Sequence, residues 1–153
     1  FKPLALFSVL LVLKMGFLAV STANRRRLSK VVLNPEDVGV NPGSHAEPQE
    51  AAETLRAKRA HLNDVENIPG FLVLATIFTL AGGSSTAGWA YFAVYFTARL
   101  LHSIFYLNSL QPWRTISFFL GQIAQLGLIV QILMRVFGSH LSRCPWMPKY
   151  GTE

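Results

Sequence analysis

The chain has no aspartate or glutamate from Asn67 to Thr152, which is more than half of its 153 residues. Seven of its eight acids lie between Glu36 and Glu66, and the eighth is Glu153. Long stretches without carboxylates are typical of packed membrane helices, because an ionised carboxylate is costly to place in hydrocarbon. Only 14% of the residues are charged, against about a quarter in soluble domains. The sequence therefore predicts a membrane protein with a single domain.

Four apolar segments predict an all-α bundle of four transmembrane helices. We expect them over residues 1–22, 63–81, 89–110 and 115–137, with a tail of unassigned fold over 138–153. A secretory signal peptide is the competing interpretation of the first segment. The apolar run is too long for one, Lys14 interrupts it, and Arg25, Arg26 and Arg27 close it. Lys14 is expected to snorkel towards the headgroups or to face the bundle, and snorkelling is the favoured interpretation.

The only long polar segment covers residues 25–60. The sequence Asn34-Pro35-Glu36-Asp37 predicts a helix start or a tight turn, because proline suits the first helical position after an asparagine cap. Residues 40–50 predict a surface loop, and the helical pattern of the second span begins at Gln49. The basic residues of this segment predict that it is cytoplasmic. The Pro69-Gly70 pair predicts a kink in the second span.

Polar side chains converge on the cytoplasmic end of the predicted bundle. Arg56, Arg59, Asn63 and Glu66 are spaced three, four and three residues apart and so share one helical face. The third span ends with Arg99, His102 and Tyr106, again on one face. Arg26 ends the first span and Arg114 begins the fourth. Groups of this kind cannot face lipid, so they need a partner or a polar ligand.

The chemistry of this cluster predicts a small anionic ligand. Arginine binds carboxylates and phosphates in pairs of hydrogen bonds, Glu66 suits an amine, and Asn63 and Tyr106 suit amides. A ligand with two carboxylates, an amine and peptide groups fits. We expect no metal site, because His61 and His102 lie on different helices and Cys144 is the only cysteine. We also expect no nucleic-acid partner, since the chain has no basic stripe with interleaved aromatic residues.

Several motifs resemble those of the MAPEG superfamily, in the branch of the microsomal glutathione transferases and the inducible prostaglandin E synthase. Residues 59–67 (RAHLNDVEN) resemble the transferase signature, and residues 34–37 (NPED) match the same branch. Residues 98–102 (ARLLH) with Tyr106, and residues 111–114 (QPWR), continue the match in the right order. The resemblance covers roughly residues 7–137.

The resemblance implies a homotrimer in the endoplasmic reticulum membrane, with the outer mitochondrial membrane as the alternative. It also implies that glutathione binds between neighbouring subunits at the cytoplasmic side. Matched by motif position, the glutathione site consists of Arg26, Arg59, Asn63, Glu66, His102, Tyr106 and Arg114. Arg114 would hold the thiol as a thiolate. In the prostaglandin synthase, residues at the positions of Asp37 and Thr115 are tied to activity. The chain departs from the synthase at Leu62 and Phe118, and Pro69 comes one residue earlier than is usual in the family.

Three functional hypotheses follow. The first is a glutathione transferase and peroxidase acting on hydrophobic electrophiles and lipid hydroperoxides dissolved in the bilayer. The second is a glutathione-dependent prostaglandin endoperoxide isomerase, and the third is a non-catalytic membrane subunit of a larger assembly. We further expect Arg99, Gln122 and Gln125 to find too few partners within one chain and to be buried between subunits.

Overall fold

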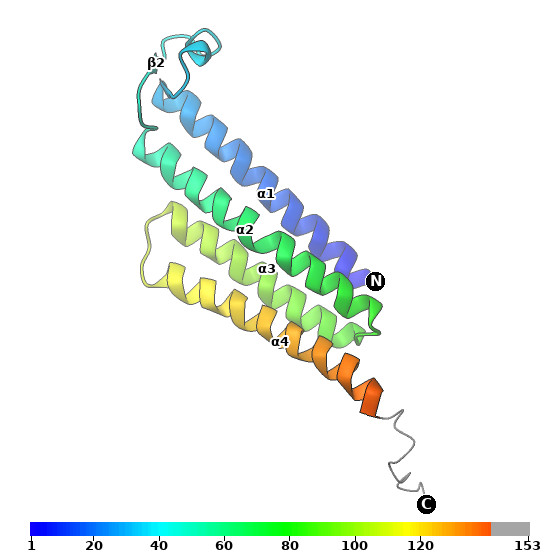
Figure 1. The fold of residues 1–153 in the computed structure, drawn as a ribbon. Helices are drawn as coiled ribbons and strands as arrows, with labels where there is room; N and C mark the ends of the chain where they lie inside the picture. Colours follow the sequence, from blue (N-terminus) through cyan, green and yellow to red (C-terminus); the bar gives the residue numbers. More distant parts are fainter. Residues whose placement is uncertain (142–153) are drawn as a thin grey trace, which may run out of the picture.

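The computed structural model describes residues 1–141 of the chain and gives only the backbone for the last three of these. Four helices make up most of it: α1 (Lys2–Ser29), α2 (Ala52–Leu80), α3 (Ser85–Leu107) and α4 (Trp113–Leu141). They lie side by side and nearly parallel to a common axis (Figure 1). This arrangement confirms the all-helical prediction. α4 continues past the expected end at Phe137, so the predicted tail begins as helix, and residues 142–153 lie outside the described part.

Two of the helices, α1 and α4, are long and apolar enough to cross a membrane. Less than a third of the residues in each apolar window is buried inside the bundle. Their exposed side chains include Phe17 on α1 and Phe119 and Ile123 on α4. An apolar surface of this extent requires lipid or another protein against it.

The helices begin and end where local chemistry directs them. Ser84 caps α3, its hydroxyl accepting a hydrogen bond from the Ala87 amide at 3.2 Å. Gly82 has φ +75°, which gives the tight turn between α2 and α3. Pro69 lies inside α2, and the helix continues through it without a break.

The segment between α1 and α2 forms a small cap beyond the end of α1 (Figure 1). It holds the two-residue strands β1 (Val31–Val32) and β2 (His45–Ala46), which pair in parallel. Between them lies η1 (Pro35–Val38), a 3₁₀ turn. The predicted turn at residues 34–37 is thus confirmed, while the strand pair was not foreseen.

The core of the bundle is aromatic. The rings of Phe71 on α2 and Tyr95 on α3 stack with their centroids 3.6 Å apart, and Phe92 meets Phe71 edge-on at 5.7 Å. Leu128 of α4 and Leu11 of α1 are fully buried beside them. α4 packs mainly against α3, and α1 and α4 make no close backbone approach within the described residues. α1 and α4 therefore lie on opposite sides of the bundle, with α2 and α3 between them.

Candidate functional site

Arg114 is held between the end of α3 and the start of α4. Its guanidinium carbon lies 4.6 Å from the centre of the Tyr106 ring, a cation–π distance. His102 Nδ1 donates to the Arg114 carbonyl at 2.9 Å, and the His102 and Tyr106 rings are 5.7 Å apart. The structure therefore brings together three predicted site residues, His102, Tyr106 and Arg114. This agrees with the prediction from their spacing and from their positions at the end of the third span and the start of the fourth.

Gln111 fixes the head of the same arginine. With its amide oriented so that both ends find partners, its oxygen accepts from Arg114 Nη2 at 2.5 Å and Nε at 3.1 Å. Its nitrogen then donates to the hydroxyl of Thr115 at 3.0 Å. The sequence motif at residues 111–114 thus supplies both the arginine and the side chain that orients it.

Arg26 lies in a second group, at the junction of α1, the cap and α2. Its Nε donates at 3.1 Å to Oε1 of Glu50, and its Nη2 bonds the same oxygen. Lys58 Nζ lies 3.2 Å from the other oxygen of Glu50, as an ion pair without hydrogen-bond geometry. The Glu50 side chain is only 2% exposed, whereas that of Arg26 is 37% exposed.

Burial by itself raises the pKa of the Glu50 carboxyl, but the two cations outweigh it. The hydrogen bonds from Arg26 and the positive charges of Arg26 and Lys58 together hold that pKa below its usual value. Glu50 is therefore ionised at neutral pH, and the group as a whole keeps one excess positive charge.

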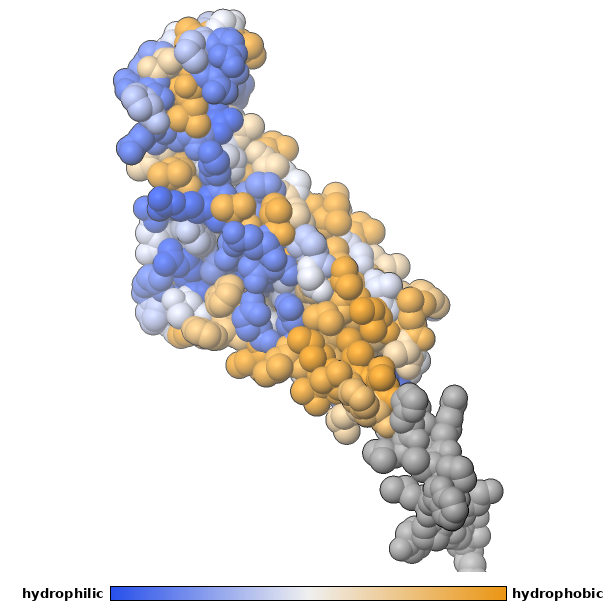
Figure 2. Space-filling model, viewed as in Figure 1, coloured by the Kyte–Doolittle hydropathy of each residue, from blue (hydrophilic) through white to orange (hydrophobic). Residues whose placement is uncertain are grey.

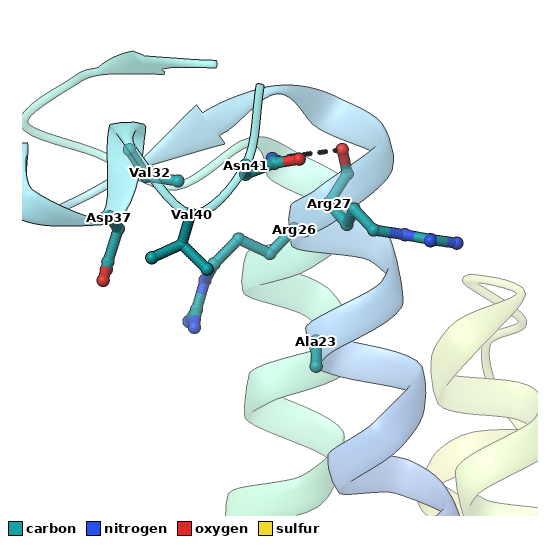
Figure 3. A pocket seen from close by; sticks show the side chains of 7 residues that line it. All are labelled: Ala23, Arg26, Arg27, Val32, Asp37, Val40 and Asn41. Carbon is teal, nitrogen blue, oxygen red and sulfur yellow. Dashed lines mark hydrogen bonds between the residues drawn. The ribbon is translucent and has the colours of Figure 1, made fainter. Parts of the chain in front are cut away.

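A surface pocket of about 300 Å³ opens beside this group (Figure 3). Arg26 extends into it beneath Val40, on the side to which the Asp37 carboxylate points, while Arg27 points away. Asp37 accepts a hydrogen bond from Asn34 at 3.2 Å and makes no direct bond to Arg26. Arg26 and Asp37, two of the predicted site residues, thus share one pocket, whereas Thr115 lies in the Arg114 group.

Arg59 and Glu66 lie on an exposed face of α2. Neither makes a hydrogen bond or ion pair with any other described residue. Arg56, on the neighbouring part of α2, bonds the Ser109 hydroxyl in the α3–α4 turn. Figure 2 shows that hydrophilic side chains gather at the cap end of the visible face, while the opposite end is mainly hydrophobic. Arg59 and Glu66 are available to a ligand or a neighbouring subunit.

The carboxylate buried inside the helical bundle is Asp64, whereas Glu66 is exposed. Asp64 is fully buried, bonds Lys14 through one oxygen, and accepts from Arg99 Nη2 at 2.6 Å through the other. Lys14 also donates to the Ser103 hydroxyl at 2.6 Å. The expectation that Lys14 snorkels is wrong: its ammonium faces the bundle, because a buried carboxylate stabilises it there better than lipid does.

The expectation of too few partners within the chain is wrong for Gln122 and holds only in part for Arg99. Arg99 Nη2 donates to Asn63 Oδ1 at 2.6 Å as well as to Asp64, and Gln122 donates to Asn67 Oδ1 at 2.8 Å. Gln125 does keep a buried oxygen without a partner. Polar groups from α2, α3 and α4 therefore satisfy one another only in part, because Arg99 Nε and Nη1 are also buried without a hydrogen-bond partner within the chain.

The predicted site residues thus fall into three groups in one chain. His102, Tyr106 and Arg114 form one, Arg26 and Asp37 another, and the α2 face carries Arg59 and Glu66, with Asn63 turned inward to Arg99. Sequence reasoning missed Glu50, Asp64 and Gln111. A signal for Asp64 was present, because it falls four residues from both Ala60 and Ile68 on the inward face of α2. Within residues 1–141, no three His, Cys, Asp or Glu side chains gather as a metal would require.

Comparison with known proteins places the chain among membrane enzymes. Residues 4–134 match the model of the MAPEG family. The chain is 34% identical to microsomal glutathione S-transferase 1 of Bos taurus over 137 residues, covering 87% of this chain and 88% of the relative. It is 35% identical to the Rattus norvegicus protein of the same name over 131 residues, covering 83% and 84%. Identity to prostaglandin E synthase of Mus musculus is 35% over 132 residues, covering 86% of each chain.

Proposed function

The chain belongs to the MAPEG family, and from this premise we propose that it is a membrane-bound glutathione transferase and peroxidase. Its substrates would be hydrophobic electrophiles and lipid hydroperoxides, which concentrate in the bilayer. The relatives named microsomal glutathione S-transferase support the use of glutathione by this chain. A role in detoxification and lipid metabolism follows from that substrate class.

The observation that carries the proposal is the placement of Arg114. Its guanidinium stands at the first turn of α4, where the helix dipole already favours negative charge. Gln111 and Tyr106 hold it there. A guanidinium beside a thiol lowers the pKa of that thiol, and the thiolate is the nucleophile in transfer to an electrophile. Arg114 is thus the residue proposed to keep the glutathione sulfur ionised.

The remaining groups suit the rest of glutathione. Arg59, which is exposed, and Arg26, which is half-buried, are cations that can bind its two carboxylates. Glu66 is an exposed carboxylate for its amine, and Asn63, His102 and Tyr106 lie near enough to this end of the bundle to contact its amides. Their residue types match a small peptide with two carboxylates and one amine, which is the ligand expected from the sequence.

A homotrimer in which all four helices span the membrane would bring these groups into one site. In one chain the Arg26 group and the Arg114 group lie on helices that do not pack together, because α1 and α4 are on opposite sides of the bundle. A neighbouring copy that packs against either side of the bundle would place its own arginines beside those of the first chain. The exposed apolar faces of α1 and α4 supply surfaces for this packing and for lipid.

A second candidate is a glutathione-dependent prostaglandin E synthase. Two observations favour it: the similarity to the mouse enzyme of that name, and the Thr115 hydroxyl held by the same Gln111 that orients Arg114. Asp37 would serve as its acid. Within one chain Asp37 and Thr115 belong to separate groups, so this function also depends on contact between subunits.

The test uses the purified protein in detergent or nanodiscs. It is incubated with glutathione and, in parallel, with an aryl halide, a fatty-acid hydroperoxide and a prostaglandin endoperoxide, and the products are identified. Conjugation and hydroperoxide reduction support the first function, and isomerisation of the endoperoxide supports the second. If glutathione neither binds nor raises the melting temperature, a non-catalytic membrane subunit becomes the better description.

The proposed location is the endoplasmic reticulum membrane, in keeping with the microsomal names of the relatives. The outer mitochondrial membrane is the alternative. In either membrane the cap would face the cytoplasm, because basic residues lie on both sides of it, in the last turns of α1 and in the first turns of α2. Fluorescence microscopy of the tagged protein with markers for both membranes separates the two.

A further inference from the structure

Glu50 is a buried carboxylate that no sequence motif indicates. It is the last residue but one before α2 begins, and its side chain is nearly inaccessible to solvent. A carboxylate in such a place costs free energy unless cations and hydrogen-bond donors surround it. Arg26 and Lys58 provide these, from α1 and α2 respectively. Glu50 therefore ties together the two helices and the end of the cap.

The ion pair with Glu50 occupies one edge of the Arg26 guanidinium and leaves another edge free. Nε and Nη2 both bond the same oxygen of Glu50, so the edge between these atoms is occupied. Nη1 makes no bond to any described residue, and the side chain is 37% exposed. In Figure 3 the head of Arg26 lies in the mouth of the pocket that Asp37 also lines. The edge between Nη1 and Nη2 is thus the one left for an incoming carboxylate.

We propose that Glu50 is a positioning residue, which holds Arg26 so that its free edge binds a carboxylate of glutathione. This inference rests on the proposed function, in which Arg26 is a glutathione ligand. A free arginine side chain loses much rotamer freedom when it binds a ligand, and fixing it beforehand removes part of that cost. Because two cations surround one carboxylate, a positive charge remains for the anionic ligand even with Glu50 in place.

The positioning role and simple electrostatics predict opposite changes in glutathione affinity when Glu50 is neutralised. Glu50→Gln removes a negative charge near an anionic ligand, so long-range attraction alone would tighten binding. Loss of the Arg26 anchor instead weakens it. We expect the Kd and KM for glutathione to rise about fivefold in Glu50→Gln, in the range of couplings between residues in contact. The kcat and the pH profile of thiolate formation should stay unchanged, because Arg114 is untouched.

Glu53 provides a matched control. It lies three residues further on, and it pairs with Arg25 at 3.5 Å on the surface, where the Glu53 side chain is 83% exposed. Glu53→Gln makes the same change of charge at nearly the same place without a buried anchor. We expect it to bind glutathione as well as the wild type does, or slightly more tightly.

A double-mutant cycle shows whether Glu50 acts through Arg26. Arg26→Ala should weaken glutathione binding, and adding Glu50→Gln to it should have no further effect. Glu50→Asp, which keeps the charge with a shorter reach, should fall between wild type and Glu50→Gln, and it remains informative if Glu50→Gln does not fold. Binding is measured by titration calorimetry, and folding by thermal melting in the same detergent.

The outcomes separate the inference from the function on which it rests. If the wild type does not bind glutathione, the proposed function fails. If the wild type binds but Arg26→Ala or Glu50→Gln binds equally well or better, the positioning role of Glu50 is wrong and the function stands. Equal losses in Glu50→Gln and Glu53→Gln would also overturn the role, since they would show only an effect of charge.

Discussion

The guanidinium carbon of Arg114 lies 4.6 Å from the centre of the Tyr106 ring, across the junction of α4 and α3. The contact joins a residue at the first turn of one helix to a residue in the last turn of the other. It holds a cation at the polar end of the bundle without neutralising it, because a ring, unlike a carboxylate, carries no net charge. Arg114 therefore remains available to an anion.

Arg114→Ala should lower the fraction of bound glutathione that is ionised at neutral pH. The guanidinium favours the thiolate, and each pKa unit lost corresponds to about 1.4 kcal/mol of thiolate stabilisation. The ultraviolet absorbance of the thiolate, followed against pH with glutathione bound, measures this. Arg114→Lys is the control that keeps the charge. A titration of Arg114→Ala that overlays the wild type's would show that Arg114 only anchors the helix.

Replacing Tyr106 should show whether its ring or its hydroxyl matters. Tyr106→Phe keeps the cation–π contact, whereas Tyr106→Leu removes it at a cost of about 0.5–2 kcal/mol. We expect Tyr106→Phe to keep near wild-type kcat and Tyr106→Leu to lose several-fold, because Arg114 is then less well held. Steady-state kinetics at saturating glutathione give the comparison. Equal losses in both variants would assign the role to the hydroxyl.

Asp64→Asn should destabilise the fold by about 3–5 kcal/mol, because it leaves Lys14 and Arg99 as buried cations without a counter-charge. Thermal or denaturant unfolding in detergent measures this. Glu66→Gln is the matched control, since Glu66 is exposed on the same helix and has no partner among the described residues; its effect should stay within about 0.5 kcal/mol. A small effect of Asp64→Asn would mean that the buried triad is not required for folding.

The attachment of the cap should weaken at acid pH. The folded-state pKa of Glu50 is lowered from 4.5, so its stabilising contribution is complete above about pH 4.5. The contribution is lost as the pH falls through the lowered folded value. Hydrogen exchange of amides near residues 45–55, corrected for intrinsic rates, should therefore speed up below about pH 4.5. The exchange should lose this dependence in Glu50→Gln, and an unchanged pH response there would assign it to another group.

Cross-linking in mild detergent should trap a trimer. The apolar faces of α1 and α4 and the unpaired Arg59 and Glu66 on α2 all require a partner at a membrane boundary. A cross-linker between cysteines introduced on α1 and α4 should join different chains, because these helices do not pack together within one. A stable monomer that binds glutathione would contradict the proposed assembly.

The sequence by itself determined the four helices, the turn at residues 34–37 and the meeting of His102, Tyr106 and Arg114. These features depend on local information: apolar length, capping residues, and spacings of three and four that place side chains on one face. The same spacing rule would put Asp64 on the inward face of α2, although the sequence-based prediction did not apply it there. It did not identify its partners, because Lys14 and Arg99 are distant in the chain.

Only the tertiary structure decided which charges pair. Lys14 could face lipid headgroups or a buried carboxylate, and the choice depends on Asp64 lying beside it, 50 residues along the chain. Glu50 lies in a loop whose sequence carries no periodicity, so only the packing of α1 against α2 brings Arg26 and Lys58 to it. Ion pairing depends on distances between side chains, and a linear sequence sets those distances only after the helices have packed.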